Sequence, residues 1–163
     1  KLPENIDSRF NQYKGCFLIK NISNGDIAVF NEEQCRVRWK PCSTFKIPNT
    51  LIGLELKKAN PKTVFKWDGK KKYFKAWEKN HNLSSAIKVS AVPVYQELAR
   101  NIGIKEMSSF VTKLKYGNKT IGTKVDRFWL DGPLAISAYE QLDFLERLYK
   151  DKLPFQKKTH KLC

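Results

Sequence analysis

Long apolar runs, metal-binding patterns and flexible linkers are all missing from this sequence of 163 residues. No stretch approaches the roughly 18 consecutive apolar residues that a membrane-spanning helix needs. The four cysteines form no paired Cys-x-x-Cys motifs, so neither a zinc site nor any other metal site is expected. Because no linker or internal repeat divides the chain, we predict a single domain over residues 1–163.

Negative charge is also scarce, with 16 Asp and Glu against 31 Lys and Arg, which gives a net charge of +15. Such a balance makes nucleic acid or an anionic surface a candidate partner. The lysine run at 70–72 is not interleaved with aromatic residues that could stack on bases, and no groove-reading helix accompanies it. We therefore predict a solvated surface loop there and no nucleic-acid partner.

The cysteines leave two alternatives open. Cys35 and Cys42 are seven positions apart and could form a disulfide in an oxidising compartment if their Cα atoms come within about 7 Å. The other alternative is free buried thiols, since cysteine packs as a small hydrophobic residue.

Apolar residues at different periods predict a small hairpin followed by a buried helix. Residues 15–20 and 27–30 are apolar runs separated by a turn that carries Asn24-Gly25, which is typical of a β-hairpin. Residues 43–58 have apolar side chains at helical spacing. Pro48 lies beyond the first free amides of that helix, so we expect a distorted or 3₁₀-like opening turn.

The second half of the chain predicts further helices after a long surface loop at 57–79. Residues 92–100 and 107–114 have helical spacing and are each followed by a glycine, Gly103 and Gly117. Ser137 and Glu140 have the spacing of a capping box, and the apolar positions up to Tyr149 continue a helix from it.

Two Ser-x-x-Lys pairs, Ser43 with Lys46 and Ser85 with Lys88, could each place a hydroxyl one helical turn from an amine. If neutral, the amine can take the hydroxyl proton and activate the serine as a nucleophile. Only Ser43 opens an apolar helix, where desolvation would lower the pKa of the lysine. We therefore interpret the pair at Ser85 as structural.

Four motifs in order resemble those of class D serine β-lactamases, the oxacillinase type. They are Pro41-Cys-Ser-Thr-Phe-Lys-Ile-Pro-Asn49, then Ser90-Ala-Val92, then Tyr116-Gly-Asn118, and then Phe128-Trp-Leu-Asp-Gly-Pro-Leu134. Trp67-Asp-Gly69 also falls where that family usually carries it. Taken singly the motifs are weak, because a tryptophan in an apolar loop is more often core, Tyr-Gly-Asn is a turn, and a lone serine is a helix cap.

This resemblance implies a role for nine residues. Ser43 would be the acylated nucleophile, Lys46 the general base carried as a carbamate formed with CO₂, Ser90 the proton relay and Trp129 a hydrogen-bond donor to the carbamate. The implied substrate-binding residues are Phe45, Val92, Tyr116, Asn118 and Leu130. No cofactor is implied beyond CO₂ as N-carboxylysine. The implied partners are β-lactam antibiotics, and the implied compartment is the periplasm or the cell exterior, with a mature chain that carries no signal peptide.

The family's late Lys-Thr-Gly strand has no counterpart in these residues. We therefore expect an α+β fold of the β-lactamase and penicillin-binding-protein type, with a helical region and an incomplete antiparallel sheet. The missing part would come from a complementing chain or segment, and a homodimer is the alternative expected partner. The alternatives to a hydrolase are a β-lactam sensor that is acylated without turnover and a truncated inactive homologue.

Overall fold

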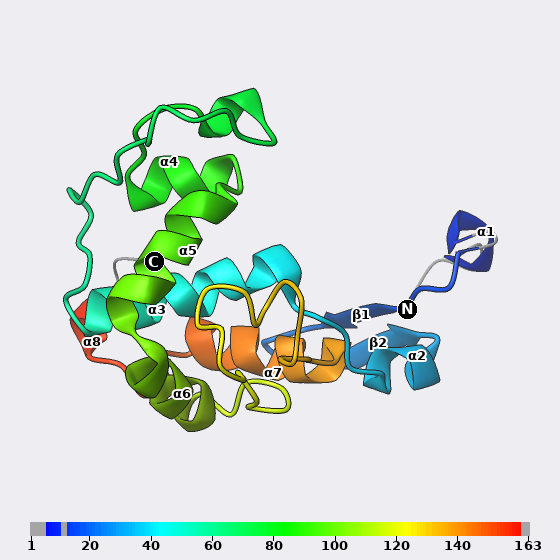
Figure 1. The fold of residues 1–163 in the computed structure, drawn as a ribbon. Helices are drawn as coiled ribbons and strands as arrows, with labels where there is room; N and C mark the ends of the chain where they lie inside the picture. Colours follow the sequence, from blue (N-terminus) through cyan, green and yellow to red (C-terminus); the bar gives the residue numbers. More distant parts are fainter. Residues whose placement is uncertain (1–5, 11–12, 161–163) are drawn as a thin grey trace.

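Most of the regular structure is helical (Figure 1), in a computed structural model that describes residues 6–10 and 13–160. Two short strands form one small sheet, so the predicted α+β class with a small antiparallel sheet is confirmed. The elements in chain order are α1 (Ile6–Phe10), β1 (Phe17–Lys20), β2 (Ile27–Phe30), α2 (Glu32–Arg36), the 3₁₀ helix η1 (Cys42–Phe45), α3 (Lys46–Glu55), the 3₁₀ helix η2 (Lys75–Trp77), α4 (Leu83–Lys88), α5 (Val92–Ile102), α6 (Ile104–Lys113), α7 (Ala138–Tyr149) and α8 (Lys157–His160).

The predicted hairpin is confirmed and packs beside α7. Strands β1 and β2 pair antiparallel, with Phe17 opposite Phe30 and Lys20 opposite Ile27. Gly25 has a φ of 84° in the connecting turn, a conformation that glycine adopts without steric cost. Lys20 reaches the helix through an ion pair of 2.6 Å with Glu146. The hairpin is therefore tied to the helical region.

Helix α3 lies at the centre of the helical region, between α5, α8 and η1. The predicted opening is confirmed, because η1 is a 3₁₀ turn that leads directly into α3. Gly53 allows α5 to approach closely, since a Cβ there would lie 2.8 Å from a methyl carbon of Leu98. The packing of α5 on α3 also brings their first turns together. Ser43 lies just before α3 and Ser90 just before α5.

The boundaries of the later helices follow the signals seen in the sequence. Helix α5 ends at Gly103, whose φ is 85°. Helix α6 begins three residues earlier than position 107 and ends at Lys113. At the start of α7 the Ser137 hydroxyl accepts from the Glu140 amide at 3.2 Å, and the Glu140 carboxylate accepts from the Ser137 amide at 2.9 Å. The predicted capping box is therefore confirmed.

An aromatic cluster fills the core beneath η1. Phe45 is fully buried and its ring meets those of Tyr116, Phe128 and Trp129, with centroid distances of 5.6, 5.0 and 5.5 Å. Tyr116 continues the cluster to Phe144 on α7 at 5.1 Å. These rings join four separate segments of the chain, and each buried aromatic side chain contributes on the order of 3 kcal/mol to stability.

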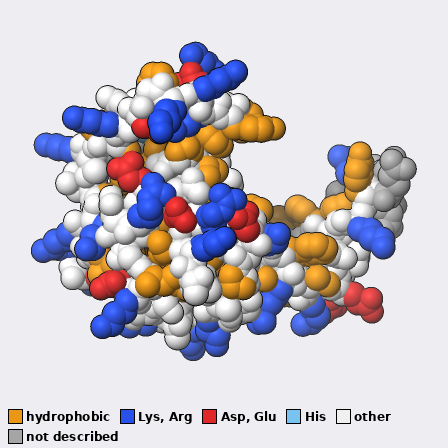
Figure 2. Space-filling view, viewed as in Figure 1, with side chains coloured by type: hydrophobic (Ala, Val, Ile, Leu, Met, Phe, Trp, Pro, Cys, Tyr) orange, Lys and Arg blue, Asp and Glu red, His pale blue; other side chains and the backbone are white. Residues whose placement is uncertain are grey.

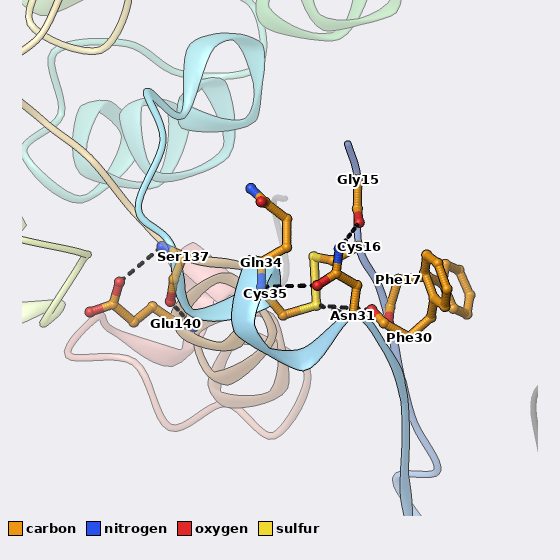
Figure 3. Close-up of a disulfide and its surroundings, with 9 residues drawn as sticks. All are labelled: Gly15, Cys16, Phe17, Phe30, Asn31, Gln34, Cys35, Ser137 and Glu140. Atoms are coloured by element: carbon orange, nitrogen blue, oxygen red, sulfur yellow. Dashed lines mark hydrogen bonds between the residues drawn. A yellow bond between two sulfur atoms is a disulfide. The ribbon is translucent and has the colours of Figure 1, made fainter. Parts of the chain in front are cut away.

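The disulfide of this structure joins Cys16 to Cys35, with their Cα atoms 5.5 Å apart (Figure 3). The considered Cys35–Cys42 bridge is therefore wrong, and Cys42 is an exposed free thiol. The hairpin returns the chain so that Cys16, just before β1, lies against α2, which carries Cys35. A hydrogen bond of 3.0 Å from the Asn31 amide group to the Gly15 carbonyl fastens the same place. Cys42 instead follows the segment that leads away from α2.

Loss of this disulfide should destabilise the chain. It closes a separation of 19 residues, so Cys16→Ser should lower the free energy of unfolding by about 2–4 kcal/mol. The exposed Cys42 offers a matched control, and Cys42→Ser should change the free energy of unfolding by no more than about 0.5 kcal/mol. Denaturant unfolding measures both changes. Peptide mapping without reductant that links Cys35 to Cys42 would contradict the pairing.

Candidate active site

Three polar side chains meet where η1, α3 and the α4–α5 connection come together. The Ser43 hydroxyl oxygen lies 2.8 Å from Lys46 Nζ and 2.9 Å from the Ser90 hydroxyl oxygen. Ser43 is exposed, whereas only 2% of Lys46 is. The site therefore presents one hydroxyl to solvent and holds an amine directly behind it. We call these three residues the serine–lysine site.

The backbone before Ser43 is held in an uncommon conformation. Cys42 has a φ of 48°, in the left-handed region that costs a non-glycine residue about 1 kcal/mol. Its amide donates to the Trp129 carbonyl at 2.9 Å, which ties the start of η1 to the loop after Val125. Because Lys46 begins α3 one turn later, the hydroxyl and the amine face the same side.

Ser90 is also left-handed, with a φ of 51°. The turn that contains it is fixed by its neighbours: the Ala91 amide donates to the Ala86 carbonyl at 2.8 Å, and the Trp77 indole N–H donates to the Val89 carbonyl at 2.9 Å. Trp77 is a residue that sequence reasoning missed. No local sequence pattern links Trp77 to Ser90. Trp77 lies in η2, before α4, whereas the turn that contains Ser90 follows α4.

Burial sets the protonation of the amine. Desolvation lowers the pKa of Lys46 from its usual value, and the nearby Cys42 opposes this to a smaller extent. Nζ lies 5.7 Å from the centre of the Tyr95 ring, and no carboxylate pairs with it among the residues that the structure describes. A lysine without an anionic partner in an apolar pocket is neutral more readily than a surface lysine, which is what a proton acceptor for Ser43 requires.

Two of the residues expected to bind substrate lie in the core instead of at the surface. Phe45 and Tyr116 are both 0% exposed. The Tyr116 hydroxyl donates to the Gln141 side-chain oxygen at 2.9 Å, and burial raises the pKa of Tyr116 to about 12. In this conformation both rings therefore pack beneath the serine–lysine site. A contact with substrate would require the residues that cover the two rings to move.

The other expected residues flank the serine–lysine site at different depths. Trp129 is 1% exposed and its ring is stacked on that of Phe45. Leu130 and Val92 are half-buried, one directly after Trp129 and the other at the start of α5. The Asn118 side chain is bonded to the backbone at Pro133 and Ala135. The four expected catalytic residues thus lie on segments that the fold holds together.

The second Ser-x-x-Lys pair is structural, as its sequence context predicts. The Ser85 hydroxyl accepts from the Asn82 amide at 3.1 Å and completes the capping box of α4. It also meets Nδ1 of the buried His81 at 3.0 Å. Lys88 is exposed, so this pair has the spacing of the serine–lysine site without its buried amine.

The part of the chain that the structure describes contains no group of three His, Cys, Asp or Glu side chains able to hold a metal ion. Within the same residues, no helix is long and apolar enough to span a bilayer. Figure 2 shows a surface hollowed between the upper part, which contains α4, and the arm that carries the hairpin, with basic side chains scattered around it.

Together, an exposed serine and a buried lysine within hydrogen-bond distance form the arrangement of a nucleophile with an adjacent proton acceptor, which makes them a candidate active site. The sequence model of the penicillin-binding protein transpeptidase domain matches residues 8–161. β-Lactamase OXA-5 of Pseudomonas aeruginosa is 45% identical over 144 residues, which cover 88% of this chain and 54% of that protein. β-Lactamase OXA-48 of Klebsiella pneumoniae is 40% identical over 159 residues, which cover 96% and 60%.

Solved structures give the same result. The crystal structure of a class D β-lactamase from Bacillus subtilis superposes with a TM-score of 0.93 at 40% identity and covers 97% of this chain and 67% of that one. The chain therefore belongs to the class D β-lactamase family, as its motifs predict. It spans between 54% and 60% of the length of the two curated relatives named above.

A test of the buried amine follows from the direction of its pKa shift. Since the folded-state pKa of Lys46 lies below the usual value of 10.5, the unfolded chain binds more protons in the pH window between the two values. The cost of burying the charge is thus fully present below the folded pKa and is relieved as pH rises towards 10.5. Lys46→Met should raise the free energy of unfolding by about 1–3 kcal/mol near neutral pH.

The gain from Lys46→Met should shrink as pH approaches the ordinary lysine pKa. Denaturant unfolding in CO₂-free buffer measures it, and Lys88→Met is the control, with an expected change within about 0.5 kcal/mol at either pH. A loss of stability in Lys46→Met that is the same at all pH values would show that the amine is not under a desolvation penalty.

Proposed function

We propose that the chain carries the acylation site of a β-lactam hydrolase, in which Ser43 opens the lactam ring. The observation that carries this proposal is the pair of distances of 2.8 and 2.9 Å from the Ser43 hydroxyl to Lys46 and Ser90. Membership of the class D β-lactamase family gives the substrate class. The relatives are longer than the matched region, so the activity of the whole protein is part of the proposal.

The first step is the attack of Ser43 on the lactam carbonyl carbon. As the C–O bond forms, the hydroxyl proton passes to the general base carried by Lys46, whose Nζ lies 2.8 Å from the hydroxyl oxygen. Collapse of the tetrahedral intermediate breaks the C–N bond, and Ser90 relays the proton held by the base to the leaving nitrogen, so that both Ser90 and the base end the step in their starting forms. Its position 2.9 Å from Ser43 suits this relay. The product is an ester of Ser43 with the ring-opened substrate.

The oxygen of the lactam carbonyl becomes negative during this step and needs hydrogen-bond donors. The Ser43 amide is one candidate, because the first amides of a helix have no partner within the helix and η1 begins one residue earlier. Its placement next to the nucleophile is the arrangement that such a donor requires. Hydrolysis then completes the cycle: water attacks the ester carbon and gives a proton to the base, the C–O bond to Ser43 breaks, and the base returns the proton to the Ser43 oxygen.

Lys46 also fits reaction with CO₂, which the family resemblance implies. The amine is 2% exposed, has a lowered pKa and lacks an anionic partner among the described residues, so its neutral form can add to CO₂. The addition forms an N–C bond and releases the proton of the amine, and the resulting N-carboxylysine supplies an anionic oxygen that can accept the Ser43 proton. Trp129, on the loop that is bonded to Cys42, is the proposed hydrogen-bond donor that would hold it.

The remaining expected residues are proposed as the walls of the serine–lysine site. Val92 and Leu130 are half-buried and can contribute apolar surface to a bound ring system. Phe45 and Tyr116 would act from the core: Phe45 packs against both Tyr116 and Trp129, and this packing would fix the position of the Trp129 ring. Asn118 is proposed to act through the loop at 133–135 to which its side chain is bonded.

An oxidising compartment is proposed for the protein, namely the periplasm or the cell exterior. Disulfides persist in such compartments and are rare where thiols are kept reduced. The Cys16–Cys35 bond supports this placement, because it joins two segments of the fold and involves no residue of the serine–lysine site.

Intact-mass spectrometry of the chain with a penicillin tests the acylation directly. We expect a mass gain of one penicillin molecule that Ser43→Ala abolishes. Ser85→Ala is the matched control, because it removes the other Ser-x-x-Lys serine and should leave the gain intact. A gain that persists in Ser43→Ala would place the reaction elsewhere.

The lifetime of the adduct separates the two functional classes. Decay with release of hydrolysed penicillin supports the hydrolase, whereas an adduct that persists indicates a β-lactam sensor. No adduct and no hydrolysis from a folded chain would contradict the proposed function for these 163 residues.

A further inference from the structure

The loop that carries Trp129 has little regular structure of its own. Residues 126–136 contain turns and a single β-bridge, between Ile136 and Trp39. The loop nonetheless reaches the residue before Ser43, since the Trp129 carbonyl accepts the Cys42 amide at 2.9 Å. Contacts from outside the loop therefore bear on the position of Trp129.

Asn118 bonds to the returning arm of this loop at three points. Its backbone amide donates to the Ala135 carbonyl at 2.9 Å, its side-chain Nδ2 donates to the Pro133 carbonyl at 2.9 Å, and its Oδ1 accepts from the Ala135 amide at 3.1 Å. Oδ1 also accepts from the Thr120 amide at 3.2 Å. The side chain thereby joins the turn after α6 to the loop.

These bonds use most of the capacity of the Asn118 amide group. Oδ1 has two acceptor positions, and the amides of Ala135 and Thr120 take both. Nδ2 has two hydrogens, and the Pro133 carbonyl takes one. A single N–H is left, so the side chain is built into the protein and has little to offer a substrate.

Gly117 makes the approach between the turn and the loop possible. It has a φ of 53°, and a Cβ at this position would lie 2.1 Å from the Ala135 carbonyl oxygen. Any side chain here would push the loop away from Asn118. Glycine and asparagine therefore act together, one by leaving space and the other by bonding across it.

The anchored arm is connected to Trp129 by a short path. The Leu134 amide donates to the Phe128 carbonyl at 3.2 Å, which closes the loop on itself next to Trp129. Leu134 and Phe128 are both 0% exposed. Loss of the contacts at Pro133 and Ala135 would free the returning arm and, through this closure, the position of the Trp129 ring.

From these contacts we infer that Asn118 is a positioning residue for Trp129 and not a substrate contact. It holds the loop so that Trp129 stays stacked on Phe45 beside the serine–lysine site. The effect on Lys46 rests on the proposed function, because it assumes that Trp129 helps to hold the carboxylated form of that lysine.

Three variants of the 163-residue chain test the inference. Asn118→Ala removes all the side-chain bonds, and Asn118→Asp keeps the two acceptor bonds while losing the donor. Asn82→Ala is the matched control, because Asn82 also accepts a backbone amide, at 2.8 Å, but caps α4. Two readouts apply: hydrogen exchange of the amides at 128–136, and the ¹³C signal of the Lys46 carbamate during titration with ¹³C-bicarbonate.

In Asn118→Ala, we expect the amides at 128–136 to exchange about tenfold faster and half-maximal carbamate to need about tenfold more bicarbonate. Asn118→Asp should recover part of both effects. Asn82→Ala should speed exchange near α4 and leave the bicarbonate titration unchanged, which separates positioning from a general loss of stability.

Exchange at 128–136 that is equal in Asn118→Ala and the wild type would overturn the anchoring. Unchanged bicarbonate titration beside faster exchange would overturn the effect on Lys46. If the wild type itself shows no carbamate signal at saturating bicarbonate, the carboxylation of Lys46 fails as part of the proposed function. The exchange data alone then support or overturn the role of Asn118.

Discussion

The burial of the Lys46 amine is the constraint on which the rest of this structure depends. An ammonium group that leaves water without an anionic partner is costly, and the cost falls as the amine loses its proton. Lys46 is 2% exposed, and Phe45, the residue before it, meets Trp129 and Phe128 in the aromatic cluster. The cluster thus stabilises the fold and, at the same place, supplies part of the apolar setting that lowers the pKa of Lys46.

The geometry of the serine–lysine site requires a strained backbone at the two turns that carry Ser43 and Ser90. Cys42, just before Ser43, and Ser90 itself both have left-handed φ values. A tryptophan contributes to each turn: the Trp129 carbonyl accepts the Cys42 amide, and the Trp77 indole donates to Val89, next to Ser90. Such conformations persist only where surrounding contacts over-determine them. The close approach of the two hydroxyls is therefore maintained by residues far away in the sequence.

Features that depend on a few neighbouring residues could be predicted from the sequence. The capping box at Ser137, the end of α5 at Gly103 and the 3₁₀ opening before Pro48 are of this kind. The partner of Cys35 could not be predicted, because it depends on how the hairpin returns Cys16 to α2. The same holds for the bonds of Asn118 and the depth of Tyr116. For the candidate active site, the motifs predict which residues belong to it, and only tertiary contacts show which of them face solvent.

The two Ser-x-x-Lys pairs show why spacing alone carries no chemistry. Ser85 has Lys88 one turn away, yet its hydroxyl is hydrogen-bonded to Asn82 and His81, and the Lys88 side chain is exposed. Ser43 has the same partner at the same spacing, but its hydroxyl is exposed and its lysine is buried. Helical geometry brings the two groups together in both places. Two features distinguish them, the exposure of the serine hydroxyl and the burial of the lysine, and the core that surrounds Lys46 produces the second.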